Sequence, residues 1–420
     1  MAPLISSSSL RLPPQASAYV AAGAAASLSV LILRRAFAGS FQVPHPDDDA
    51  GITPSPLTTV LPHLTPAEIK ALPYPPDALP GARDVPSPYG TFRVYEFGPN
   101  DGRKVLFVHG ISTPSIGLAP IAQRLAERGC RVMLFDLFGR GFSSLPPSNI
   151  PHDTRLYTTQ IHLALASSPV SWTSPSLDDI TTDNPSETAN RSPTYSMSSA
   201  HSSPSRTSPP PGFTLVGYSL GGGLAAAFTS HYPNLVHSLV LLAPGGILRP
   251  EHVTTTSRLL YYAPRALLPD WLAERLRPRP HSGSGRGPDP DAAPLLADRP
   301  ASSVSGAVAW QLAHHAGFAR AVLGCLREGP IHGQGRAWGR VGAGVAAARG
   351  RGREERRAVS KVLVVLGQRD GVVRADEVGR DAREALGEEN VVVVVLDAGH
   401  GVPYECPEEV VGVMERNWRE

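Results

Sequence analysis

A serine between two glycines stands where an expected strand meets an expected helix. Residues 217–221 read Gly-Tyr-Ser-Leu-Gly, after the apolar run 213–218 and before a helical pattern over 220–232. A sharp strand-to-helix turn strains the backbone of its central residue, and the flanking glycines remove side chains that would clash. The hydroxyl of Ser219 should then project above the sheet at the positive end of the helix. A dinucleotide loop would need the spacing G-x-G-x-x-G, which Ser219 breaks, so the pattern predicts a nucleophile.

A serine hydroxyl needs a base, and the base needs an acid to orient it. Asp370 follows the apolar run 361–366, and His400 follows the apolar run 391–396. Since the carboxyl ends of parallel strands lie along one edge of a sheet, we expect Ser219, Asp370 and His400 to meet there. These three residues form the expected catalytic set.

Two other acids compete with Asp370 for this role. Asp397 lies only three residues before His400, at the expected strand end, and Asp376 falls within an expected helix over 375–386. Asp370 is preferred because it stands in a turn directly after a strand. The pair His314-His315 has no acids at metal-binding spacing beside it.

Acyl transfer also requires hydrogen-bond donors for a developing oxyanion. One expected donor is the backbone N–H of Leu220, directly after the serine. The other is the backbone N–H of Ile111, in the turn that follows the expected strand 104–109.

The elements that must position these residues alternate between strands and helices at both ends of the chain. Expected strands are 91–97, 104–109, 131–136, 213–218, 238–242, 361–366 and 391–396, and expected helices include 65–72, 118–125, 220–232, 375–386 and 407–418. The last two strands are unbroken Val/Leu runs, as is typical of parallel strands covered on both faces. Residues 248–358 show helical patterns instead, over 254–276 and 303–327. This order predicts an α/β fold with a doubly wound, mostly parallel sheet and a helical cap.

Taken together, these features resemble the α/β-hydrolase family, and its serine-hydrolase branch in particular. The resemblance rests on His109-Gly110, the segment 136–143, Ser219, Asp370 and His400, and covers roughly residues 90–165, 213–250 and 360–420. It implies an eight-stranded core, a Ser-His-Asp triad and no cofactor. In that family the segment 136–143 is a structural turn beside the site, so it receives no catalytic role. The serine at 219 argues against the epoxide hydrolases and dehalogenases of this fold, which place Asp there.

Composition limits the classes of function. The chain has 39 Lys and Arg against 37 Asp and Glu, a net charge of +2, which gives no case for a nucleic-acid partner. Its three cysteines, Cys130, Cys325 and Cys406, are far apart; they exclude a disulfide scaffold, show no zinc spacing and are interpreted as buried thiols. No metal or nucleotide motif is present, so we expect neither a metal nor another cofactor.

Glycine and proline are concentrated in parts of the chain. The 40 Gly and 43 Pro are about 20% of 420 residues, against roughly 12% on average. From 167 to 211, 28 of 45 residues are Ser, Thr or Pro, which is typical of a segment that cannot bury a core. We expect an N-terminal anchor or targeting segment (1–41), a Pro-rich tether (42–88), the first part of the core (89–166), a disordered insertion (167–211), the core with the serine turn (212–249), a cap with disordered tracts (250–358) and the C-terminal core (359–420).

The N-terminal segment has three interpretations. It contains Arg11, Arg34 and Arg35, no acid before Asp47, and an 18-residue apolar stretch at 16–33. A single membrane anchor is preferred, with the arginine pair holding the following domain on the cytoplasmic side. A mitochondrial presequence and a cleaved signal peptide are the alternatives. We therefore expect a membrane-anchored protein and leave the organelle open.

The expected substrate is a carboxylic ester. The cap segment 259–272 is apolar and surrounded by arginines, as in an interfacial helix, although the same residues could simply cover the cleft. With the N-terminal segment, this favours a lipid ester at a membrane, in a layout similar to membrane-anchored monoacylglycerol lipases. A small-ester carboxylesterase, a peptidase or a C–C bond hydrolase of the same fold are alternatives. A non-catalytic, membrane-tethered scaffold is the alternative from another class.

Overall fold

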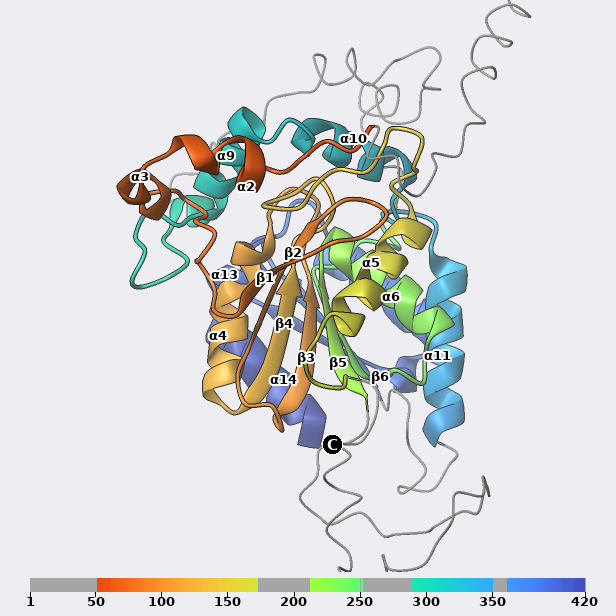
Figure 1. Ribbon diagram of the computed structural model, residues 1–420. Helices are drawn as coiled ribbons and strands as arrows, with labels where there is room; N and C mark the ends of the chain where they lie inside the picture. Colours follow the sequence, from red (N-terminus) through yellow and green to blue (C-terminus); the bar gives the residue numbers. More distant parts are fainter. Residues whose placement is uncertain (1–50, 173–211, 250, 252–288, 350–360, 420) are drawn as a thin grey trace, which may run out of the picture. The chain divides into compact units, whose positions relative to one another are not determined.

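The structure is a computed structural model that describes residues 51–172, 212–249, 251, 289–349 and 361–419. Eight strands form one sheet in the order β1-β2-β4-β3-β5-β6-β7-β8 (Figure 1). They are β1 (Ala82–Val85), β2 (Phe92–Phe97), β3 (Arg103–Val108), β4 (Cys130–Phe135), β5 (Phe213–Tyr218), β6 (Val236–Leu242), β7 (Val362–Gly367) and β8 (Val391–Leu396). The β1–β2 and β2–β4 pairs are antiparallel, and the other five neighbouring pairs are parallel. The expected doubly wound, mostly parallel sheet is confirmed.

Helices cover both faces of the sheet (Figure 1). One face carries α4 (Ala119–Glu127), α13 (Val402–Glu405) and α14 (Pro407–Arg419), and the other carries α5 (Thr154–Ala166), α6 (Leu220–His231), α11 (Gly335–Arg349) and α12 (Ala375–Leu386). Because both faces are covered, the central strands can be apolar at every position, and all six residues of β5 and of β7 are buried.

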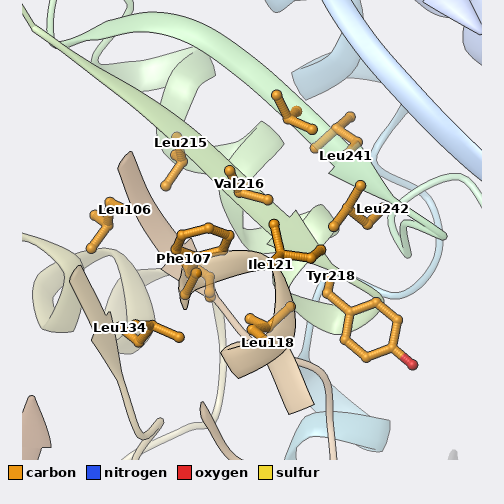
Figure 2. Close-up of a cluster of buried hydrophobic side chains, with 14 of the residues drawn as sticks. Leu106, Phe107, Leu118, Ile121, Leu134, Leu215, Val216, Tyr218, Leu241 and Leu242 are labelled. Atoms are coloured by element: carbon orange, nitrogen blue, oxygen red, sulfur yellow. The ribbon is translucent and has the colours of Figure 1, made fainter. Parts of the chain in front are cut away.

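The core lies between the central strands and these helices. Figure 2 shows Leu118, directly before α4, and Ile121, in its first turn, among side chains of β3 to β6, including Phe107 and Leu241. These four side chains are at most 1% exposed. Full burial of each such side chain contributes about 1.5–3 kcal/mol. The packing fixes the carboxyl ends of the strands, where the expected site residues lie.

Residues 51–88 differ from the expected Pro-rich tether, because they belong to the folded unit. They form α2 (Pro56–Thr59), the 3-10 helix η1 (Leu61–His63), α3 (Pro66–Lys70) and strand β1. Thr65 and Glu68 form a capping box at the start of α3. Tyr74 is fully buried, and its hydroxyl lies 3.0 Å from both carboxylate oxygens of Asp136 and 2.9 Å from the Tyr95 hydroxyl. The buried Tyr74 thus anchors residues 51–88 to the core through its hydrogen bonds, although their composition suggests a linker.

The cap also differs in detail from the expectation. The pattern at 303–327 forms two helices, α9 (Val304–His314) and α10 (Phe318–Glu328), because His315 turns inward and bonds to the carbonyl of Ser143 at 2.9 Å. Residues 335–349, which fall within the expected cap with disordered tracts (250–358), form helix α11. Gly342 has no room for a side chain, because a Cβ there would overlap the carbonyl of Leu386, the last residue of α12. Gly342 therefore permits close packing of α11 against the end of α12.

Several expectations concern residues outside the described ranges. These are the N-terminal segment 1–41, most of the insertion (173–211) and the helical pattern at 254–276. The start of the insertion is described, and Trp172 is buried there, with its indole N–H 2.9 Å from Ser168 Oγ. In the described part of the chain, no helix combines the length and hydropathy that crossing a membrane requires.

Candidate active site

Ser219 occupies the turn between β5 and α6 with a strained backbone. Its φ is 53° and its ψ is −119°, in a region that residues with side chains rarely adopt. The flanking glycines are required by space: a Cβ on Gly217 would overlap the carbonyl of Gly221, and one on Gly221 would overlap the carbonyl of Val108. The strand, turn and helix thus give Ser219 the sharp-turn geometry that the sequence predicts.

Hydrogen bonds from neighbouring strands and turns hold this strained residue in place. The Ser219 N–H donates to the carbonyl of Leu242 at 3.0 Å. Its carbonyl accepts from the N–H of Gly222 at 2.9 Å and from that of Gly245 at 2.7 Å. The backbone of Ser219 is therefore fixed on both sides, so its side chain has a defined direction.

His400 joins Ser219 to Asp370. Its Nε2 lies 3.1 Å from Ser219 Oγ, and its Nδ1 lies 2.8 Å from Asp370 Oδ2. A carboxylate can only accept, so Nδ1 carries the proton and Nε2 is free to accept from the serine hydroxyl. Three residues from three strand ends thus form one continuous chain of hydrogen bonds.

The Asp370 carboxylate is fully buried and held by its own turn. Its Oδ1 accepts from the N–H groups of Val372 at 2.7 Å and Val373 at 2.8 Å, which leaves Oδ2 for His400. The competing acids lie elsewhere: Asp397 is 81% exposed and pairs with Arg369 at 2.8 Å, and Asp376 is 66% exposed. Among the described residues, Asp370 is the acid that contacts the His400 ring.

Glu405 is a neighbour of His400 that sequence reasoning does not single out. Its Oε2 accepts from the N–H of Gly399 at 2.9 Å and its Oε1 from that of Gly401 at 3.1 Å. The Glu405 side chain is 12% exposed. Its position five residues after a candidate histidine, at the end of the short helix α13, is the only sequence signal for it.

One tyrosine lies beside His400, and another bonds to the cap. The Tyr218 ring lies 5.4 Å from the His400 ring, centroid to centroid, and the Tyr404 hydroxyl donates to Asp291 Oδ1 at 2.7 Å. Asp291 lies in the 3-10 helix η5 (Pro290–Ala292). Burial raises the pKa of both tyrosines above the ordinary value, so they stay protonated and can donate hydrogen bonds.

The loop after β3 lies against the serine turn. A Cβ placed on Gly110 would be 3.4 Å from Ser219 Cβ. Among the described residues, no acceptor faces the backbone N–H of Ile111 or of Leu220. Burial lowers the pKa of His109, at the start of this loop, to about 3, so its imidazole is neutral. Stabilisation of an oxyanion needs unpaired N–H groups of this kind, and the roles of Ile111 and Leu220 stay predictions.

The cysteines are buried, as expected, and none of them contacts Ser219, Asp370 or His400. Burial raises the pKa of Cys130 and Cys406 to about 11, so both are thiols at neutral pH. Within the described ranges, no group of three or more His, Cys, Asp or Glu side chains is arranged to hold a metal ion.

Comparison with known proteins agrees with this fold. The chain is 25% identical over 170 residues to a serine hydrolase-like protein of Danio rerio, a match that covers 40% of this chain and 39% of that protein. The chain therefore aligns with about two fifths of the length of this relative. It is also similar to the crystal structure of a candidate lipase, lip1, from Acinetobacter baumannii AYE, with a TM-score of 0.50 and 13% identity over 81% of this chain and 93% of that one. At that identity the likeness shows the fold alone.

A model of the alpha/beta hydrolase family matches residues 105–413, which is well over half of the chain. That range includes the serine turn, the Asp370 turn and His400. With its sheet order, its covering helices and this match, the chain belongs to the α/β-hydrolase family.

Proposed function

We propose that this chain is a serine hydrolase that cleaves carboxylic esters through an acyl-enzyme. Ser219 is the nucleophile, His400 the general base and acid, and Asp370 the residue that orients His400. The observation that carries the proposal is the continuous contact from Ser219 Oγ to His400 at 3.1 Å and on to Asp370 at 2.8 Å. This arrangement activates a hydroxyl that is otherwise unreactive at neutral pH.

In the first half of the reaction, Ser219 Oγ attacks the ester carbonyl carbon while its proton moves to His400 Nε2. The buried Asp370 carboxylate stabilises the imidazolium that forms. The negative charge on the carbonyl oxygen is met by the N–H groups of Ile111 and Leu220. The intermediate then collapses: the bond to the alkoxy oxygen breaks, His400 protonates the departing alcohol, and the acyl group stays on Ser219.

In the second half, water replaces the alcohol. His400 takes a proton from the water as its oxygen attacks the acyl carbon, and the same N–H groups meet the second oxyanion. Collapse returns the proton to Ser219 Oγ and releases the carboxylic acid. No cofactor takes part in either half of this proposed sequence.

We propose a lipid-type ester at a membrane as the substrate class. Its support is the apolar stretch 16–33 and the apolar, arginine-flanked segment 259–272, both read from the sequence and outside the described residues. An ester series graded by acyl-chain length, presented in solution and in phospholipid vesicles, tests this choice. A preference for long chains and higher turnover on vesicles is expected, whereas a preference for short, soluble esters favours a carboxylesterase.

Labelling by a fluorophosphonate probe tests the chemistry itself. Wild-type protein should be labelled, and Ser219→Ala should lose both labelling and ester turnover while keeping the same thermal unfolding temperature within a few degrees. Ser230→Ala, at the other end of α6, is the matched control and should be labelled like wild type. Folded wild-type protein that neither takes the label nor hydrolyses any ester would contradict the proposal and favour a non-catalytic scaffold.

A further inference from the structure

Side chains hold three consecutive carbonyl groups of the loop after β3. The carbonyls of residues 110, 111 and 112 contact, in that order, His109 Nδ1 at 2.8 Å, Arg140 Nε at 3.0 Å and Gln311 Nε2 at 3.1 Å. All three side chains are buried. They come from the end of β3, from the turn after β4 and from cap helix α9, so three parts of the chain meet on one loop.

Carbonyls held in this way fix the directions of the N–H groups. A trans peptide is planar and points its C=O and its N–H in opposite directions. The Gly110 carbonyl belongs to the same peptide unit as the Ile111 N–H, the proposed oxyanion donor. His109 Nε2 accepts from the Leu137 N–H at 2.8 Å, so the ring proton is on Nδ1 and faces the Gly110 carbonyl. The bonds to the next two carbonyls keep the following peptide units from turning.

Arg140 is placed in an unusual way for a charged residue. It is 0% exposed, and its guanidinium donates to the carbonyl of Phe138 at 2.8 Å, to the hydroxyl of Tyr157 at 2.7 Å and to Cys325 Sγ at 2.9 Å, besides Ile111. No ion pair in the described ranges includes Arg140. A buried charge without a carboxylate is costly for folding, and departures of this kind are expected at functional sites.

Gln311 connects the same loop to the cap. Its Oε1 accepts from the N–H of Gly141 at 2.6 Å, and its Nε2 donates to the carbonyls of Ser112 and, within α9, Ala307, both at 3.1 Å. The side chain is 0% exposed, and all three of these hydrogen bonds go to backbone groups. One cap side chain therefore bridges the turn that contains Arg140 and the loop that contains Ile111.

We propose that Arg140 and Gln311 are positioning residues for the oxyanion hole, and that the cap contributes to its geometry through Gln311. They act through the peptide groups of the loop and do not touch the substrate. This inference rests on the proposed ester hydrolysis, since it concerns the donor at Ile111. If ester hydrolysis is the reaction, the stabilisation of its transition state depends on Gln311, a residue of the cap.

The test uses Gln311→Met and Arg140→Lys in the full chain. Gln311→Met keeps the size and loses the bonds, and Arg140→Lys keeps the charge and loses the planar guanidinium. We expect kcat to fall about 10- to 100-fold, below the roughly 10²- to 10³-fold cost of deleting a donor outright. KM should stay within about twofold, because only the transition state uses the hole. The Ki of a trifluoromethyl ketone, which places an oxyanion in the hole, should rise by the same factor as kcat/KM falls.

Ser303→Ala is the control for general loosening of the cap. Ser303 caps α9 through the N–H of Gly306 at 3.1 Å and does not contact the loop, so its loss should leave kcat and the inhibitor Ki unchanged. Unchanged Ki in both positioning variants, or a change confined to KM, would overturn the inference while wild-type labelling and turnover still supported the proposed function. A wild type with neither labelling nor turnover would overturn both.

Discussion

Glu405 accepts hydrogen bonds from the backbone N–H groups on both sides of His400, at 2.9 Å from Gly399 and at 3.1 Å from Gly401. Glycines have the widest backbone freedom, and a histidine between two of them needs an external restraint to keep its ring in one place. The Glu405 carboxylate supplies that restraint because each of its oxygens takes one N–H.

The variant Glu405→Gln should test this restraint. An amide has only one acceptor oxygen, so one of the two bonds is lost, and bonds to a charged acceptor contribute about 1.5–3 kcal/mol each. We expect kcat/KM for an ester to fall about tenfold or more, with the fold retained by circular dichroism. Glu409→Gln, an exposed acid four residues later, is the control and should behave like wild type. Equal activity of the two variants would show that His400 needs no such support.

The acid of the triad is tested by a pair of isosteric changes. Asp370→Asn removes the acceptor that fixes the tautomer of His400, and kcat should fall by about 10⁴-fold. Asp397→Asn removes only an exposed partner of Arg369 and should keep nearly full activity. Steady-state kinetics on one ester decide between them, and the reverse ranking would assign the role to Asp397.

The space beside each residue predicts opposite effects of an alanine at Gly221, in the serine turn, and at Gly344, in α11. A methyl group at Gly221 would overlap the carbonyl of Val108, so Gly221→Ala should lower the free energy of unfolding by several kcal/mol or abolish folding. Gly344, in α11, has no atom within contact distance of an added Cβ, so Gly344→Ala should raise the free energy of unfolding by about 0.5–1 kcal/mol. Urea unfolding measures both, and a stabilised Gly221→Ala protein would contradict this geometry.

Two buried histidines predict that acid weakens the fold. Burial lowers the pKa of His109 to about 3 and that of His315 to about 4. Each ring has a nitrogen that accepts a backbone N–H, from Leu137 and Gly317, so protonation would place two hydrogens against each other. The unfolded chain takes up these protons near pH 6.5, whereas the folded chain does not. The free energy of unfolding therefore keeps the full contribution of these two histidines above about pH 6.5. Below that pH, it falls by about 1.4 kcal/mol per pH unit for each of them.

Urea unfolding between about pH 7 and pH 5 measures this slope. His315→Gln, which keeps one donor and one acceptor, should reduce the slope by about one histidine's share. A slope identical in the wild type and in His315→Gln would show that His315 does not titrate on unfolding.

The sequence predicts most of the sheet, because buried parallel strands have a strong apolar signal. Strands β5 and β8 have the predicted bounds, and the order of Ser219, Asp370 and His400 along strand ends is enough to expect their meeting. Strand β1 is not predicted, because Ala82–Val85 contains two charged residues in four and pairs only along one edge.

Features that depend on contacts between distant segments could not be predicted in this way. The composition of α11 is that of an irregular tract, and only the close approach to Leu386 explains a glycine at 342. The same holds for Tyr74, which bonds to Tyr95 on β2 and to Asp136 just after β4, and for Gln311, whose role depends on a loop 199 residues away. Local patterns encode elements, whereas these roles arise from the tertiary arrangement.

The close approach of Trp172 and Phe213 has a consequence for how this chain can vary in length. Their ring centroids are 6.0 Å apart, so the described segments that end at residue 172 and begin again at residue 212 lie next to each other. The entropy of closing a loop between such points grows slowly, by about 0.6 kcal/mol for each doubling of its length. Replacing residues 173–211 with a short Gly-Ser linker should therefore leave ester turnover measurable. Because this entropic cost grows so slowly with length, a whole domain can be inserted between Trp172 and Phe213, by evolution or by an engineer, at little cost in stability.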